Sequence, residues 1–384
     1  GQTDADAFYG SGYMMARDRL LQMALLRRRA LGRWAEVAGE SHVDDDELSR
    51  VLNFRDLGRM DYARIEESSA EGFELLIAWT AGINRFVSEV LSGEAPLPYG
   101  FGPEGLDFEP EPWHPADLVA VSRMAFFSAS NTLEAELLAT VVRDYFPAAW
   151  DAIEFVLPFY PVWSLPEDDR PADDMNPPMA RPPSPVPRPP RELPERAERG
   201  LERFFELMAP YRTAGSNSFA IDGRHTTSGR PLLANDPHLP LEVPNLFYPI
   251  HINSEDGEGT LNVAGFTLAG SPGVSVGRND RVAWTVTTAF GDVMDVWQVA
   301  RVEGGVEVGG EVVPITTRRE GILVRGEGDS AGEGEWRLFE VDEVEGYGLL
   351  LPQGIAGIPL VPGGDRVLLA YTGFEPFGSI DSLL

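Results

Sequence analysis

A proline-rich segment divides this chain into two parts that must fold in different ways. Eleven of the 32 prolines lie between Pro166 and Pro194, among charged residues. Proline fixes its own φ angle and lacks a backbone N–H, so a segment of this composition cannot supply a packed core. We therefore interpret residues 165–215 as a connector between a helical region, 1–164, and a β-rich region, 216–384.

The region before the connector has the hydrophobic periodicity of amphipathic helices. Within residues 4–37, apolar side chains, Leu20 among them, recur at helical spacing, which predicts one long helix. A second helix is expected over 63–90. A third is expected over 115–146, because Pro115 suits the first turn of a helix.

The connector ends with a short helical stretch, 195–208, and the region after it has a hydrophobic period of two. Segments such as NLFYPIHI, TLNVAGFTL and EWRLFEV, separated by turn residues, are typical of strands. Helices followed by strands favour an α+β fold over alternating βαβ units. The length of 384 residues suits two or three domains, or one large layered domain.

Composition excludes several classes of function. The net charge of −30 opposes contact with phosphate backbones and anionic lipids, so we expect no nucleic-acid partner and no membrane partner. No run of about 18 uncharged apolar residues is available to span a bilayer. Cysteine and lysine are both absent, which excludes a disulfide framework, a cysteine nucleophile and a Schiff-base lysine.

The segment GSNSFAIDGRHTTSGRPLLANDPHL carries the most chemical information, because Ser216 has three interpretations there. A serine hydroxyl needs a base to become a nucleophile. Asp236 and His238 could complete a Ser–His–acid triad, although the GxSxG elbow is missing and both side chains come from one short stretch. Alternatively, Ser216 is a structural residue, since Gly-Ser-Asn is a common turn composition.

In the third interpretation, Ser216 becomes the first residue of a new chain. Cutting the Gly215–Ser216 bond would free an α-amine with an ordinary pKa of about 7.7–8.0, which can accept a proton at neutral pH. A flexible glycine before the hydroxyl and a dispensable connector upstream are consistent with such a cut.

The segment that starts at Ser216 resembles the β-chain start of the penicillin acylase family of N-terminal nucleophile hydrolases, which includes penicillin, cephalosporin and acyl-homoserine-lactone acylases. Two further segments resemble the family's α-chain opening and β-chain interior: DAFYGSGYMMARDRLLQMALLRRRALGRWAEVAG and SPGVSVGRNDRVAWTVTTAFGDVMDVW. The resemblance implies a four-layer αββα fold, made as one precursor and cut into an α/β heterodimer. It also implies that the sequence is a fragment truncated at both ends.

By this resemblance, Ser216 is the nucleophile and, through its freed amine, its own base. His238 takes the place of a Gln or His that supports the nucleophile and orients substrate; otherwise it is a loop histidine packed beside Pro237. The family's first oxyanion donor is a backbone N–H, which falls on Thr288 here. The second is an Asn side chain, expected beyond Leu384.

The stretch GDVMD resembles the family's calcium loop, in which carboxylates and a carbonyl bind a hard cation. The resemblance implies Asp292, Asp295 and the carbonyl of Met294 as ligands, with a carboxylate from the helical region. Glu134 is the first choice for that carboxylate, and Glu136 is the second. The other interpretation of Asp-x-x-Asp is a solvated turn. No organic cofactor is expected.

The resemblance places four apolar residues near the acyl group of the substrate: Met124, Phe127, Leu239 and Val276. Leu239 and Val276 stand where penicillin G acylases carry Phe, which suggests an aliphatic or loosely specific acyl group. All four could equally be ordinary core residues.

The implied activity is hydrolysis of a linear or cyclic amide through an acyl-enzyme on Ser216. A penicillin-acylase-like amidohydrolase acting on a β-lactam side chain or another N-acyl compound is the first expectation. An acyl-homoserine-lactone acylase and a truncated, non-catalytic binding homologue are the alternatives. Because the family is usually exported, the resemblance implies a periplasmic or secreted location.

Overall fold

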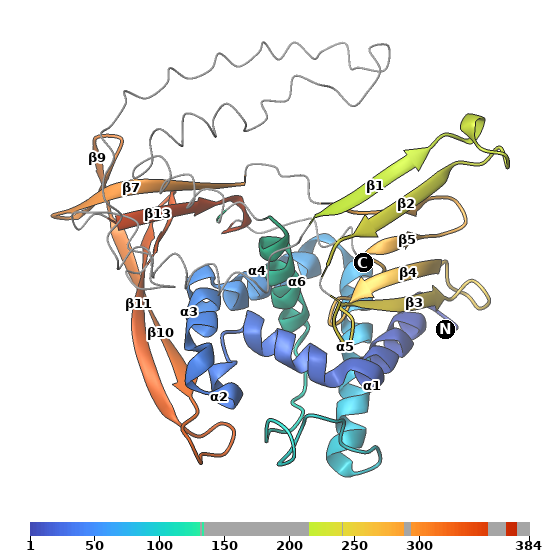
Figure 1. Ribbon diagram of the computed structural model, residues 1–384, viewed down its shortest axis with the longest axis horizontal. Coiled ribbons are helices and arrows are strands. Elements are labelled where there is room, and N and C mark those ends of the chain that lie inside the picture. The colour runs from blue at the N-terminus through green and yellow to red at the C-terminus, as the bar shows by residue number, and fades with distance from the viewer. Residues whose placement is uncertain (131–132, 134–214, 240, 288–292, 352–365, 375–384) are drawn as a thin grey trace.

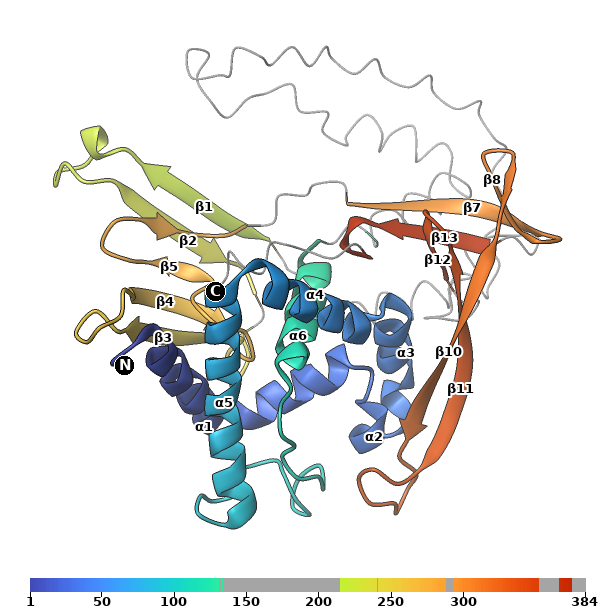
Figure 2. The same ribbon diagram turned by 180° about the vertical axis from the view of Figure 1, so that it is seen from behind.

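The computed structural model describes residues 1–130, 133, 215–239, 241–287, 293–351 and 366–374. In this part of the chain, helices from the first third lie between a four-stranded sheet and a seven-stranded sheet, as both views show (Figures 1 and 2). The predicted α+β class is confirmed. None of the described helices is long and apolar enough to cross a lipid bilayer.

The first helix, α1 (Asp4–Ala30), is shorter than the predicted 4–37. It begins with a capping box, in which the side chains of Thr3 and Asp6 each accept a hydrogen bond from the other residue's backbone N–H. It ends because Gly32 takes a φ of 62°, a left-handed conformation that glycine adopts without strain. The chain then forms the short helix α2 (Ala35–Ala38).

The predicted helix 63–90 is in fact the end of one helix and most of the next. Ser69 leaves the helical conformation, and its hydroxyl accepts a 3.1 Å hydrogen bond from the N–H of Gly72, so it caps a new helix. The third predicted helix is confirmed as far as Ser130, and its remainder, like the helix predicted over 195–208, lies outside the described residues. The remaining helical elements of the first third are η1 (Glu40–His42), α3 (Val43–Leu52), α4 (Phe54–Ser68), α5 (Ala70–Ser92) and α6 (Pro115–Ser130).

The strands after the connector form three antiparallel groups, which confirms the β-rich second part. A separate hairpin consists of β1 (Ser216–Ile221) and β2 (Leu232–Pro237), joined through η4 (Gly223–His225). The four-stranded sheet has the order β3 (Phe247–Asn253), β4 (Asn262–Leu268), β5 (Val276–Arg278) and β6 (Ala283–Trp284). The seven-stranded sheet has the order β10 (Ile315–Val324), β11 (Glu335–Val344), β12 (Gly348–Leu351), β13 (Arg366–Tyr371), β7 (Met294–Val302), β8 (Gly305–Val308) and β9 (Glu311–Val313), and η6 (Thr372–Phe374) follows β13.

Two apolar cores hold the sheets against the helices. One core joins α1 and α5 to the four-stranded sheet and includes Ile252 of β3. The other joins α3 and α6 to the seven-stranded sheet and includes Val341 and Leu369. Residues of α6 enter both cores, so this helix links the two sheets.

Helices α1 and α5 approach so closely that their contact requires glycine. A Cβ on Gly12 would lie 2.2 Å from the carbonyl oxygen of Trp79, and a Cβ on Gly82 would lie 2.0 Å from that of Tyr9. Both are backbone atoms that cannot move independently of their helices. These glycines therefore set the distance at which the two longest described helices pack.

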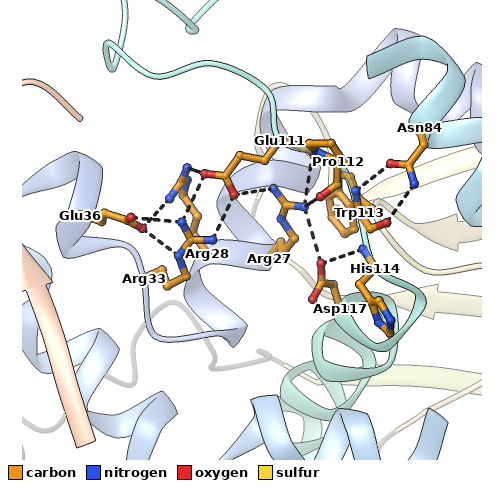
Figure 3. A network of polar contacts seen from close by, with 10 residues as sticks. All are labelled: Arg27, Arg28, Arg33, Glu36, Asn84, Glu111, Pro112, Trp113, His114 and Asp117. Atoms are coloured by element: carbon orange, nitrogen blue, oxygen red, sulfur yellow. Dashed lines mark hydrogen bonds and ion pairs between the residues drawn. The ribbon is translucent and has the colours of Figure 1, made fainter. Parts of the chain in front are cut away.

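A network of arginines anchors the end of α1 (Figure 3). Glu111 accepts from Arg28 at 2.5 Å and from Arg33 at 3.0 Å, and Glu36 accepts from the same two arginines at 2.9 Å and 2.8 Å. Burial opposes the charge on Glu111, but these guanidinium groups still lower the pKa of its carboxyl. Arg27 donates to the carbonyl of Pro112 at 2.9 Å, so the network joins α1 to the segment that leads into α6.

A second buried ion pair joins three elements. Arg123 of α6 donates to both carboxylate oxygens of Asp61 on α4, at 2.5 Å and 2.7 Å, and to the carbonyl of Gly373 at 2.5 Å. The Asp61 side chain is 0% exposed and the Arg123 side chain 3% exposed. The pair therefore connects the helices to the chain that leaves β13.

We expect Asp61→Ala to lower the free energy of unfolding by about 3–5 kcal/mol, because it leaves a buried guanidinium without its carboxylate. Asp56→Ala on the same helix is the matched control, since Asp56 pairs with the partly exposed Arg55 and Arg59. Asp56→Ala should lower the free energy of unfolding by less than about 1 kcal/mol. Urea unfolding measures both, and equal losses would contradict a special role for the buried pair.

Candidate nucleophile site

The candidate site lies where β1 begins. Ser216 is the first residue of this strand and stands opposite Pro237 of β2. Its hydroxyl donates to the carbonyl oxygen of Gly215 at 2.7 Å. Gly215 has a φ of 125°, in the region that favours glycine, so the residue type at this position is set by the backbone.

His238 lies beside the same peptide bond. Its backbone N–H donates to the carbonyl oxygen of Gly215 at 2.9 Å, so this oxygen accepts two hydrogen bonds, one from His238 and one from Ser216. A Cβ built on Gly215 would lie 3.8 Å from Nδ1 of the imidazole, so this ring nitrogen lies near Gly215. The structure thus places His238 beside the Gly215–Ser216 peptide bond, and its role as a support for the nucleophile stays a prediction.

The other nitrogen of the imidazole contacts a carboxylate. Nε2 of His238 is 2.8 Å from Oδ2 of Asp236, and the amide nitrogen of Asn217 lies 3.2 Å from Nε2 and 3.5 Å from the same carboxylate oxygen. The hydrogen bond from His238, followed by that from Asn217, lowers the pKa of the Asp236 carboxyl. The side chains of Asp236 and His238 are 67% and 45% exposed, so their contact orients the ring more than it stabilises the fold.

A further segment holds β1 in place. The hydroxyl of Thr287 donates to the carbonyl oxygen of Ser216 at 3.2 Å, and the hydroxyls of Ser218 and Thr285 share a hydrogen bond. The amide of Asn235 donates to the carbonyl oxygens of Asn217 and Val286, both at 3.0 Å. Thr288, the predicted oxyanion donor, lies outside the described residues, but the segment that leads to it contacts Ser216.

The four predicted pocket residues lie in different surroundings. Met124 and Phe127 on α6 are buried in the core beneath the seven-stranded sheet, where the ring of Phe127 contacts Tyr371. Val276 is buried on β5, whereas Leu239 follows His238 and is half-buried. Met124 and Phe127 are therefore core residues in this structure.

The predicted calcium ligands are only partly described. Met294 begins β7 with a buried side chain, and Asp295 follows with an exposed one. Asp292, Glu134 and Glu136 lie outside the described residues. Within the described ranges, no group of three or more His, Asp or Glu side chains could hold a metal ion. Calcium therefore stays a prediction.

The contact between Asp236 and His238 was expected only in the triad interpretation of Ser216. It has a local signal in the sequence, because side chains two residues apart in an extended segment lie on the same face. The three contacts of residues 285–287 with the hairpin were not predicted, and they join residues that lie 51 to 71 positions apart in the sequence. Periodicity alone carries no signal for such a pairing.

Asp236 also provides a test of the site's electrostatics. Because the pKa of Asp236 is lowered in the folded protein, its contact with His238 is fully present at pH values above the ordinary pKa of an aspartate. The contact is lost as the pH falls through the lowered pKa of Asp236. We expect His238→Ala to raise the pKa of Asp236. An NMR titration of the carboxyl carbons, made in a Ser216→Ala background, measures this change.

Asp222 is the internal control for that titration, because its pKa is lowered by Arg224 at the far end of the same hairpin. The His238→Ala change should leave the Asp222 curve in place. An unchanged Asp236 curve would show that the imidazole does not contact this carboxylate in solution.

Comparisons with known proteins show the family of the chain. Residues 1–353 match the family model described as penicillin amidase. The chain is 31% identical to penicillin acylase 2 proenzyme of Pseudomonas sp. strain SE83, over 98% of this chain and 48% of that protein. It is 28% identical to acyl-homoserine lactone acylase QuiP of Pseudomonas aeruginosa, over 84% of this chain and 36% of that protein.

Penicillin G acylase of Escherichia coli is 27% identical over 83% of this chain and 41% of its own length. The chain thus spans less than half the length of these three relatives. The family model nevertheless covers most of the chain and includes both the helical region and the strands that form the site. The chain therefore belongs to the penicillin amidase family.

Proposed function

We propose that this chain is part of an amide hydrolase in which Ser216, freed by cleavage of the Gly215–Ser216 bond, is an N-terminal nucleophile. The observation that carries the proposal is the 2.7 Å hydrogen bond between the Ser216 hydroxyl and the Gly215 carbonyl oxygen. The hydroxyl that would attack is thus beside the carbonyl that would be cut. The word proenzyme in the name of one relative supports a precursor that is processed.

The same arrangement suits the second stage, hydrolysis of a substrate. After the cut, the α-amine of Ser216 can take the hydroxyl proton while the hydroxyl oxygen bonds to the substrate carbonyl carbon. The amide C–N bond then breaks as the α-amine passes the proton to the leaving amine, and water hydrolyses the resulting acyl-enzyme to release the acid. We assign the backbone N–H of Thr288 as the first donor to the oxyanion. His238 supports the nucleophile, since its ring lies beside Gly215.

The proposal extends to architecture, assembly and location. A four-layer αββα arrangement, an α/β heterodimer from one precursor and a periplasmic or secreted location are the properties that family membership suggests. The helical region and the strands share two cores, so the two chains would stay together after the cut. The acyl group would contact Met124, Phe127, Leu239 and Val276.

Two substrate classes follow from the names of the relatives. One relative is named a penicillin acylase and another an acyl-homoserine lactone acylase. We place an N-acyl amide such as a β-lactam side chain first, because the relative named a penicillin acylase is matched over 98% of the chain and the lactone acylase over 84%. Relative rates on a phenylacetyl amide and a long-chain acyl-homoserine lactone distinguish the two.

Cleavage at Gly215–Ser216 is tested with the protein expressed from its complete coding sequence. N-terminal sequencing and intact mass should reveal a chain that starts Ser-Asn-Ser-Phe. Ser216→Ala should leave the precursor uncut, because no hydroxyl remains to attack the Gly215 carbonyl. Ser228→Ala, at the far end of the same hairpin, is the matched control and should be cut normally. An uncut wild-type protein that hydrolyses amides would contradict the proposal.

We also propose that Asp292, Asp295, the carbonyl of Met294 and Glu134 bind a structural calcium ion, which would join the helical region to β7. Calcium at 100 times its dissociation constant should then stabilise the fold by about 2.7 kcal/mol. Asp295→Asn should reduce this gain, and Asp280→Asn in a nearby exposed turn should preserve it. Thermal unfolding with calcium or with chelator measures the difference, and equal midpoints for the wild type would overturn the site.

A further inference from the structure

We propose that Asp236 is a positioning residue that fixes the protonation of the His238 ring, so that the ring's free nitrogen is the one that lies near Gly215, next to the bond to be cut. The inference rests on the proposed cleavage at Gly215–Ser216 and adds the group that makes it possible. Asp236 pairs with Asn217 in the hairpin, and His238 follows the end of β2. Both side chains are therefore fixed relative to Ser216 by the register of two strands.

The contacts of the ring determine where its proton lies. A carboxylate has no hydrogen to donate, so the 2.8 Å contact with Asp236 requires that Nε2 of His238 carry the hydrogen. The amide of Asn217 cannot then donate to Nε2, and it donates instead to the Asp236 oxygen at 3.5 Å. In a neutral ring, Nδ1 keeps its lone pair, and Nδ1 is the nitrogen that lies near Gly215.

The uncut chain needs such a base. Before cleavage the nitrogen of Ser216 belongs to a peptide bond, and an amide nitrogen cannot accept the hydroxyl proton as the free α-amine can. The Ser216 hydroxyl already lies against the Gly215 carbonyl, which also accepts from the backbone N–H of His238. The carbonyl is thus polarised, and the missing component is a proton acceptor next to Gly215.

His238 supplies that acceptor. The Ser216 oxygen bonds to the Gly215 carbonyl carbon while its proton moves to Nδ1 of His238. The bond between the Gly215 carbon and the Ser216 nitrogen then breaks, and the imidazolium returns the proton to that nitrogen. The product is an ester of Gly215 on Ser216 with a free α-amine, and water hydrolyses the ester to release the Gly215 carboxylate.

Asp236 is the charged partner that the structure gives His238 within the described ranges. Its carboxylate lies on the opposite side of the ring from Gly215, so it also favours the imidazolium that forms during the transfer. A role of this kind needs orientation rather than burial, which agrees with the exposure of both side chains. Asp236 touches neither Ser216 nor Gly215 in the contacts described, and it therefore acts through His238.

The test measures the cleavage rate of freshly refolded complete precursor by intact mass. We expect Asp236→Ala and Asp236→Asn to slow cleavage at least roughly tenfold, since a positioned general base contributes about 10²–10⁴. Asp222→Asn, on the same hairpin, should cut at the wild-type rate. Adding Asp236→Ala to His238→Ala should slow cleavage no further than His238→Ala alone, because Asp236 acts through the ring.

A second readout detects the protonation of the ring itself. Nitrogen-15 shifts of His238 in uncut Ser216→Ala precursor should place the hydrogen on Nε2, and Asp236→Asn should abolish that preference. A wild-type rate for Asp236→Ala, an unchanged nitrogen spectrum or an additive double variant would overturn the role of Asp236 alone. A wild-type precursor that is never cut at Gly215–Ser216 would overturn the proposed function as well.

Discussion

The antiparallel register of β1 and β2 is the constraint on which the candidate site depends. Ser216 stands opposite Pro237, so the next residue, His238, comes to lie beside Gly215, and its N–H reaches the Gly215 carbonyl. A slip by one residue would turn every side chain of β2 to the other face of the hairpin. It would separate the serine, the histidine and the aspartate at once.

The hairpin has little burial of its own to fix that register. Most residues of β1 and β2 are exposed in the described part of the chain, including Phe219 and Leu232. Polar contacts replace the missing core, because Asn235, Thr285 and Thr287 tie the hairpin to the chain after β6. The helices position this chain indirectly, through the core that α1 and α5 share with the four-stranded sheet.

Much of this arrangement could be predicted from the sequence where the signal is local. Periodicity of 3.6 and of two predicted most of the helices and the main strands, whereas the division at the proline-rich segment stays a prediction. Helix ends were harder to predict. Ser69 starts α5 by capping it, and Gly32 ends α1 with a positive φ, whereas the apolar periodicity gives no signal at either position. The ion pair between Asp61 and Arg123 was not predictable, since it joins residues on two helices whose packing only the fold determines.

The candidate site could also be predicted only in part. Ser216 and His238 were predicted through resemblance, and the structure places His238 beside the Gly215–Ser216 peptide bond. Asp236 was considered as the acid of a triad, and the structure does place it against His238, two residues along one extended segment. The described contacts of the Asp236 carboxylate are with His238 and Asn217, which fits a role in orienting the ring, and the nucleophile's later base can still be its own amine. The sequence could not supply the contact of Thr287 with Ser216, which depends on how β1 and the chain after β6 lie side by side.

The most direct measurement of the central claim is covalent labelling of the mature protein with a sulfonyl fluoride, followed by mass spectrometry of its fragments. We expect one adduct, on the hydroxyl oxygen of a Ser216 that is the first residue of its chain and has a free α-amine. Labelling that is absent from Ser216, or a Ser216 that still carries Gly215 in an active protein, would contradict it.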